Sequence, residues 1–129
     1  MTPEQTVIGE IGVEELKPKN GLYYYHLRTG DKHLMLTVDL SEGLAVTALE
    51  NNPELVKTTG ATTELYQKAL SIISDLATEH NVSIYYRFST SDEKMQAWLR
   101  DPNKGKTIFG DAQIKNTPIG IEAVLEISP

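Results

Sequence analysis

The stretch V-K-T-T-G-A-T-T-E-L, residues Val56 to Leu65, separates two parts of the chain that have different hydrophobic periods. Before it, apolar and polar residues alternate, which is the period of a strand with one buried face. After it, apolar residues recur at spacings of three and four, which is the period of a helix. A strand that leads through a helix into another strand predicts a crossover connection, with the two strands parallel.

The sequence before this stretch predicts an antiparallel meander. Three strands are expected at residues 22–28, 34–40 and 44–50, with turns at 29–32 and 41–43 between them. Residues 1–20 form a poorly defined N-terminal segment. A short edge strand is expected within residues 7–13, followed by a turn at 17–21.

The sequence after this stretch predicts two helices and three strands. The crossover helix is expected over roughly residues 63–80, ending at Asn81 in the left-handed conformation. A strand over 82–89 follows, and then a short helix that begins at a capping box of Thr90 and Glu93. Two last strands are expected at 107–114 and 119–127. The crossover helix is expected to pack its apolar stripe on the sheet through Leu65, Ala69, Ile72, Ile73 and Leu76.

These elements predict a single α+β domain over residues 1–129. The domain has a mixed, largely antiparallel sheet of six to seven strands. It also has one long crossover helix and one short helix. A chain of 129 residues suits one hydrophobic core.

Composition excludes several classes of function. The chain has no cysteine, which removes disulfides and thiolate chemistry, and a net charge of −6, which disfavours nucleic acid as a partner. No apolar run reaches the ~20 residues of a membrane helix, and no signal peptide pattern opens the chain, so we expect a cytoplasmic protein. The histidines His26, His33 and His80 lack the sequence spacing of metal ligands, so no metal site is expected.

The loop Lys57–Thr63 combines small and hydroxyl-bearing residues with one positive charge. The first turn of a helix carries unpaired backbone N–H groups and a partial positive charge, which together attract phosphate. Gly60 and Ala61 would let an anion approach the backbone, and the remaining members would add donors: Lys57, Thr58, Thr59, Thr62 and Thr63. The competing interpretation is an ordinary strand-to-helix connection capped by threonine.

In this segment the chain resembles the GNAT family of N-acetyltransferases. The family motif is Q/R-x-x-G-x-G/A followed by a helix with a leucine three residues on, and here the sequence reads K-T-T-G-A-T over Lys57–Thr62, with Leu65 in the leucine position. Gly60 matches, whereas Lys57 and Thr62 depart from the motif. The predicted element order is similar to that of the family over residues 21–128.

The resemblance implies an acyl-CoA N-acyltransferase-like fold that binds acetyl-CoA and transfers its acetyl group to a small-molecule or peptide amine. Residues Lys57–Thr63 would hold the pyrophosphate, and the strands at 44–50 and 82–89 would splay around the pantetheine arm. Glu50 stands where the family often has a carboxylate base, with His26 and His33 as other candidates for that role. Trp98 stands where the family often has a general-acid tyrosine.

Two alternatives follow from the same residues. Thr62 stands at the last position of the motif, where the family has Gly or Ala, and Trp98 stands in place of tyrosine. These two departures favour a non-catalytic interaction or regulatory module on the same fold. An unrelated α+β domain that pairs through its sheet edge, for example as a homodimer, is the other alternative.

Overall fold

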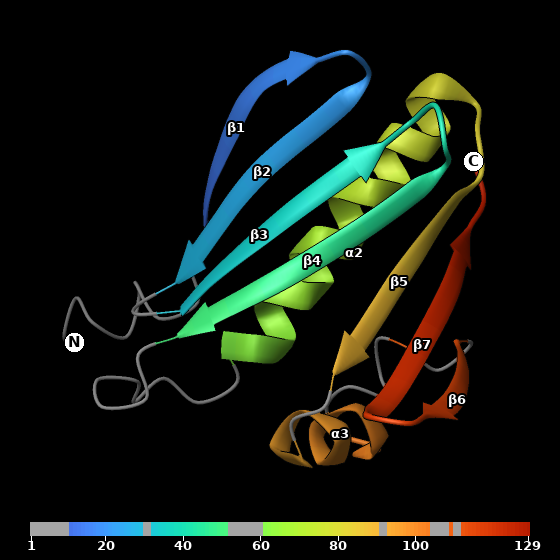
Figure 1. Ribbon diagram of the computed structural model, residues 1–129. Helices are drawn as coiled ribbons and strands as arrows, with labels where there is room; N and C mark the ends of the chain where they lie inside the picture. Colours follow the sequence, from blue (N-terminus) through green and yellow to red (C-terminus); the bar gives the residue numbers. More distant parts are fainter. Residues whose placement is uncertain (1–10, 30–31, 52–60, 91–92, 104–108, 110–111) are drawn as a thin grey trace, which may run out of the picture.

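The computed structural model describes residues 11–29, 32–51, 61–90, 93–103, 109 and 112–129, which form one seven-stranded sheet and two helices (Figure 1). The strand order is β1-β2-β3-β4-β5-β7-β6, and only the β4–β5 pair is parallel. The predicted α+β class, mixed sheet and parallel crossover are therefore confirmed. The elements are β1 (Gly12–Lys19), β2 (Leu22–Thr29), β3 (Lys32–Asp39), β4 (Leu44–Asn51), α2 (Ala61–His80), β5 (Ile84–Thr90), α3 (Glu93–Arg100), β6 (Gln113–Thr117) and β7 (Gly120–Ile127).

The first hairpin differs from the prediction. Residues 17–19, expected in a turn, belong to β1, and the turn consists of Asn20 and Gly21 alone. Both residues have positive φ, 55° and 79°, the backbone conformation of a two-residue type I′ turn. Such a turn lets Lys19 pair directly with Leu22, so the strand continues to the turn itself.

The turn between β3 and β4 is fixed at both ends. The carboxylate of Asp39 accepts hydrogen bonds from the Ser41 hydroxyl and from the Ser41 and Glu42 N–H groups, and the first of these contributes most to lowering its pKa. Gly43 has φ of 64°, and a Cβ there would lie 3.0 Å from the Ser83 carbonyl oxygen. A glycine is therefore required for this turn to approach the start of β5.

Helix α2 packs its predicted apolar stripe against one face of the sheet. It ends as predicted, with Asn81 at φ of 54° and the Val82 N–H donating to the Ala77 carbonyl at 3.0 Å. Ile72 is half-buried rather than buried. The buried members of the helix are Leu65, Tyr66, Ala69, Ile73, Leu76 and Ala77.

An aromatic cluster joins α2, β5 and α3. The ring of Phe109 lies within 6.1 Å of the Tyr66, Tyr86, Phe88 and Trp98 rings, measured between centroids. Phe109 is thus a core residue outside any strand, so the expected strand at 107–114 is wrong at that position, while residues 107, 108, 110 and 111 lie outside the described residues. Strand β6 covers only Gln113–Thr117, and the short turn after Thr117 sets its register with β7.

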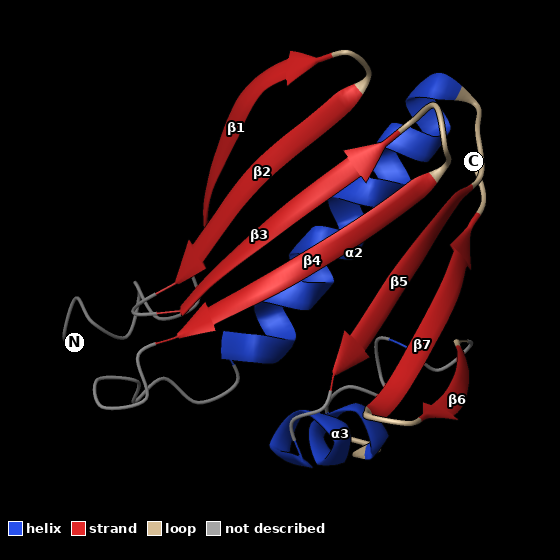
Figure 2. Cartoon of the chain, in the orientation of Figure 1, coloured by secondary structure: helices blue, strands red, loops and turns tan. Residues whose placement is uncertain are grey.

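Among the described elements, both helices lie on the same side, and none covers the opposite side of the sheet (Figure 2). We call this second side the open face. Cross-strand pairing places one row of open-face positions on all seven strands: Leu16, Tyr24, Thr37, Val46, Arg87, Val124 and Gln113. The open face is of mixed polarity, with Val46 42% and Tyr85 46% exposed.

The packing of α2 is tested by Ile73→Ala. Ile73 is fully buried, so the lost burial and the remaining cavity should lower the free energy of unfolding by about 2–5 kcal/mol. Urea unfolding measures the change, and Ser74→Ala on the exposed side of the same helix is the control, with an expected change within about 0.5 kcal/mol. Equal effects of the two substitutions would contradict this placement of the helix.

Candidate functional site

Strands β4 and β5 are joined over a short distance only. Their parallel register contains three pairs, Leu44 with Tyr85, Ala45 with Tyr86 and Val46 with Arg87. Beyond these pairs β4 continues to Asn51 and β5 to Thr90, and the two strands diverge toward their C-terminal ends (Figure 1). The sheet is thus split in its middle, at the end where α2 begins.

The split leaves backbone hydrogen-bonding groups without a ladder partner. Where β4 and β5 still pair, which we call the seam, the Tyr85 N–H donates to the Gly43 carbonyl at 2.7 Å. Along a strand, the N–H and C=O groups of successive residues point to alternate sides. Leu49 on β4 and Ser89 on β5 therefore also turn these groups toward the gap. The described register contains no β4–β5 pair at either position. These groups can bind a polar, extended ligand.

A cavity of about 380 Å³ occupies the split, and we call it the wedge cavity. Its lining combines apolar and hydroxyl-bearing side chains with strand backbone. The lining residues come from β4, α2, β5 and α3: Thr47, Ala48, Leu49, Tyr66, Phe88, Ser89, Thr90 and Met95.

Buried hydroxyl groups line part of the wedge cavity. The Thr47 hydroxyl lies 2.5 Å from the Tyr86 hydroxyl, and it also hydrogen-bonds Tyr66. Burial raises the pKa of both tyrosines well above the ordinary value, and the bonds to Thr47 offset this in part. Both phenols therefore stay protonated near neutral pH and can donate hydrogen bonds.

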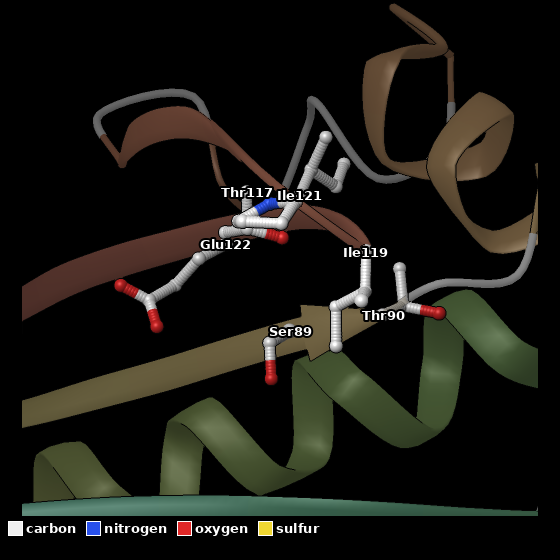
Figure 3. Close-up of a pocket in the computed structure, with 7 residues that line it drawn as sticks. Ser89, Thr90, Thr117, Ile119, Ile121 and Glu122 are labelled. Carbon is white, nitrogen blue, oxygen red and sulfur yellow. The ribbon is translucent and has the colours of Figure 1, made fainter.

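A second hollow, of about 680 Å³, lies between the end of β5 and the turn that joins β6 to β7, and we call it the turn groove (Figure 3). Ile119, 79% exposed, extends from this turn toward Ser89 and Thr90. The wedge cavity and the turn groove share these two β5 residues. The groove is lined by Ser89, Thr90, Thr117, Pro118, Ile119, Ile121 and Glu122.

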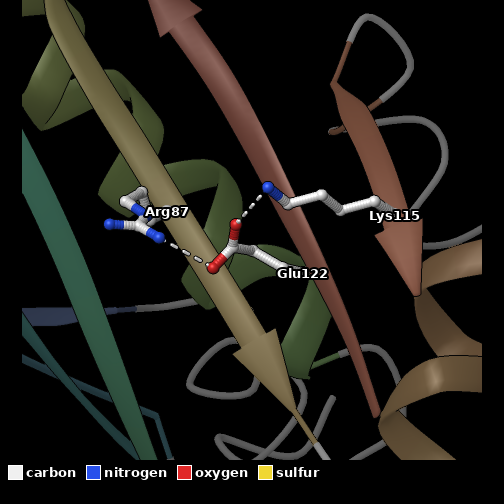
Figure 4. A network of polar contacts seen from close by, with 3 residues as sticks. All are labelled: Arg87, Lys115 and Glu122. Atoms are coloured by element: carbon white, nitrogen blue, oxygen red, sulfur yellow. Dashed lines mark hydrogen bonds and ion pairs between the residues drawn. The ribbon is translucent and has the colours of Figure 1, made fainter. Parts of the chain in front are cut away.

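Glu122 is the charged residue of the turn groove and is held by two cations on the open face (Figure 4). Its carboxylate accepts a hydrogen bond from Arg87 at 2.8 Å, and Lys115 Nζ lies 3.6 Å from its other oxygen. The Arg87 hydrogen bond is the largest cause of its lowered pKa. Glu122 is consequently an ionised, already paired group rather than a free base.

The residues expected from the sequence are placed only in part. Lys57, Thr58, Thr59 and Gly60 lie outside the described residues, whereas Ala61, Thr62 and Thr63 form the first turn of α2. Glu50 occupies the β4 position directly across from His33 on β3, so two of the candidate bases are cross-strand neighbours.

Trp98 is partly buried and packs against the core. Its indole N–H donates to the Thr63 hydroxyl at 3.2 Å, and its ring packs on Tyr66 at a centroid distance of 5.1 Å. This contact ties α3 to the first turn of α2.

Sequence reasoning missed the residues that form the two hollows. Ser89, Thr90 and Met95 were expected only as parts of a strand, a helix cap and a helix face. Their meeting with Leu49 depends on where the β4–β5 pairing stops. No local pattern in the sequence specifies that point.

Comparison of the chain with models of protein families, with curated proteins and with solved structures gave no match. Within the described residues, no helix has the length and apolar character needed to cross a membrane.

The Arg87–Glu122 contact is tested by Arg87→Ala. Removing the hydrogen bond should raise the Glu122 pKa toward the ordinary value for glutamate, and NMR titration of its carboxyl carbon measures the shift. Because the folded-state pKa is lowered, the stabilisation is present above the unfolded pKa and is lost as pH falls through the folded value.

Two further variants separate the causes. Lys115→Ala should raise the same pKa less, since its contribution is smaller. Arg100→Ala, at a cation that contacts Asn116 instead, should leave it unchanged. An unchanged Glu122 pKa in Arg87→Ala would contradict this contact.

Proposed function

We propose that this chain is an acyl-CoA-binding domain of GNAT-like fold that transfers the acetyl group of acetyl-CoA to an amine. The observation that carries the proposal is the parallel β4–β5 pair that separates after three residue pairs, with the N-terminus of the crossover helix at the open end. The resemblance of Lys57–Leu65 to the family motif supports the same interpretation.

The lining of the wedge cavity fits the pantetheine arm of a coenzyme A thioester. That arm alternates amide groups with short aliphatic segments. The backbone groups of Leu49 and Ser89, which have no β4–β5 pair in the described register, offer partners for amides. The side chains of Phe88 and Met95 offer apolar contact. The backbone N–H groups of the first turn of α2, Ala61–Glu64, would attract the phosphates.

The bound thioester would supply an activated acyl group, so the chain has to bind the acceptor and remove its proton. Glu50, two positions beyond Ala48 on β4, is the proposed base, and His33 across from it is the other candidate. The turn groove gives the amine its own approach to Ser89 and Thr90, which it shares with the wedge cavity.

One observation favours a second function. Trp98 occupies the position of the family's general-acid tyrosine, and its N–H is bonded to Thr63 in the core. Indole has no proton to give at neutral pH, so this position supplies no acid. A domain that binds acyl-CoA without transferring the acyl group fits this feature.

Binding is tested by calorimetric titration of acetyl-CoA into the wild-type chain and Ser89→Trp. Ser89 is exposed and lines both hollows, so a bulky ring there should fill the entrance and weaken binding by more than about tenfold. Ser71→Trp, on the exposed side of α2, should bind like wild type. If the wild-type chain binds no acetyl-CoA at millimolar ligand, the proposal falls.

Catalysis is tested by thiol release with a broad panel of amines. Glu50→Gln should lower the rate by ~10²-fold or more and remove its rise with pH, as expected for loss of a general base. Glu126→Gln, an exposed carboxylate at the far end of β7, is the matched control and should keep the wild-type rate. Binding of acetyl-CoA without turnover on any amine would select the non-catalytic function.

A further inference from the structure

Two histidines meet on the open face of the sheet, on β2 and β3. His26 on β2 and His33 on β3 are diagonal neighbours, because His26 pairs with Met35 and His33 pairs with Arg28. Their Nε2 and Nδ1 atoms lie 2.8 Å apart, and their rings are close to parallel, with an interplanar angle of 15°. One of these two nitrogens has to lack a proton for the hydrogen bond to form.

This separation is close to that of two ligands on one metal ion. Imidazole nitrogens bind Zn²⁺ at about 2.0–2.1 Å, which puts two of them roughly 3.3 Å apart around a tetrahedral ion. The pair therefore has to widen by only about 0.5 Å, within reach of small side-chain rotations. Both histidines sit on neighbouring strands of a continuous sheet, so binding orders little additional backbone.

The backbone register places a glutamate on each of the two flanking strands. Glu14 pairs with His26 across β1, and Glu50 pairs with His33 across β4. The nearest cation, Arg28, extends its side chain over Gly12 on β1, with Nε 3.5 Å from where a Cβ of that glycine would lie. A hollow of about 300 Å³ adjoins His26, and its lining residues are Gly12, Val13, Glu14, His26 and Arg28.

We propose that His26 and His33 form a two-histidine chelate for a divalent transition-metal ion, with water in the remaining positions. No group of three histidine, aspartate or glutamate side chains converges in the part of the chain that the structure describes, so the site is open rather than a closed structural centre. Imidazole ligands favour Cu²⁺, Ni²⁺ and Zn²⁺ over Mg²⁺, and Cu²⁺ should bind most tightly.

The sequence did not indicate this site because its two ligands are seven residues apart on different strands. Helical ligand spacings such as H-E-x-x-H cannot detect such a pair. His33 is also a candidate base of the proposed acyl transfer, but the metal site is tested by metal binding alone, so the two proposals can fail separately.

The experiment titrates CuCl₂, ZnCl₂ and MgCl₂ into the full chain at neutral pH, with calorimetry and melting temperature as the two measurements. We expect saturable one-to-one binding of Cu²⁺ and Zn²⁺ with a raised melting temperature, and no change with Mg²⁺. His26→Asn and His33→Asn should each weaken binding by more than about tenfold, since even loss of a supporting group costs a metal site 10–100-fold.

His80→Asn is the matched control, since His80 is exposed at the end of α2 and lies beside Tyr23 instead. It should bind like wild type. If an asparagine variant fails to fold, an NMR titration of the wild-type chain with Zn²⁺ tests the same point. The imidazole signals of His26 and His33 should then shift, while those of His80 should not. Absence of binding at millimolar metal would overturn the proposal, as would equal losses in His26→Asn and His80→Asn.

Discussion

Three residue pairs between β4 and β5 hold the two halves of the sheet together, and the other features of the molecule depend on this seam. The seam is parallel because α2 has to carry the chain back along the sheet while burying its apolar stripe. It is short, so its backbone hydrogen bonds are supplemented by side chains. The bond between Thr47 and Tyr86 joins residues 39 positions apart, and the Gly43 turn docks on the start of β5. The wedge cavity exists because the pairing ends where it does.

The two faces of the sheet differ in what covers them. One face is sealed by α2, α3 and Phe109, whose aromatic contacts bring distant parts of the chain together. The other is left open by the described elements and carries the Arg87–Glu122–Lys115 contacts and the His26–His33 pair. At the outer edge, β1 has a register shift against β2 between Leu16 and Lys19, and Pro18 in this part of the strand has no backbone N–H to donate.

Periodicity was sufficient to predict the α+β class, the antiparallel meander, the crossover helix and the parallel strand that follows it. Local chemistry also predicted Asn81 at the helix end, because asparagine tolerates positive φ. The prediction was wrong where a local signal was misinterpreted. The turn consists of Asn20 and Gly21 only, whereas it was expected over Lys17–Gly21. Phe109 was expected in a strand, but it is a core residue outside any strand. The hollows were not predictable, because they arise from where two strands stop pairing rather than from any residue pattern.

The short seam also divides the chain by the range of its contacts, and this bears on how the molecule folds. Strands β1 to β4 are consecutive and joined by turns, so their pairing closes only short loops. Pairing of β4 with β5 brings Leu44 to Tyr85 and has to wait until the intervening helix is placed. Contacts of long sequence separation slow folding, so pairing at the seam is expected to follow pairing within the meander. The opening that would receive a ligand is thus expected to form late, at a step that closes a long loop of the chain.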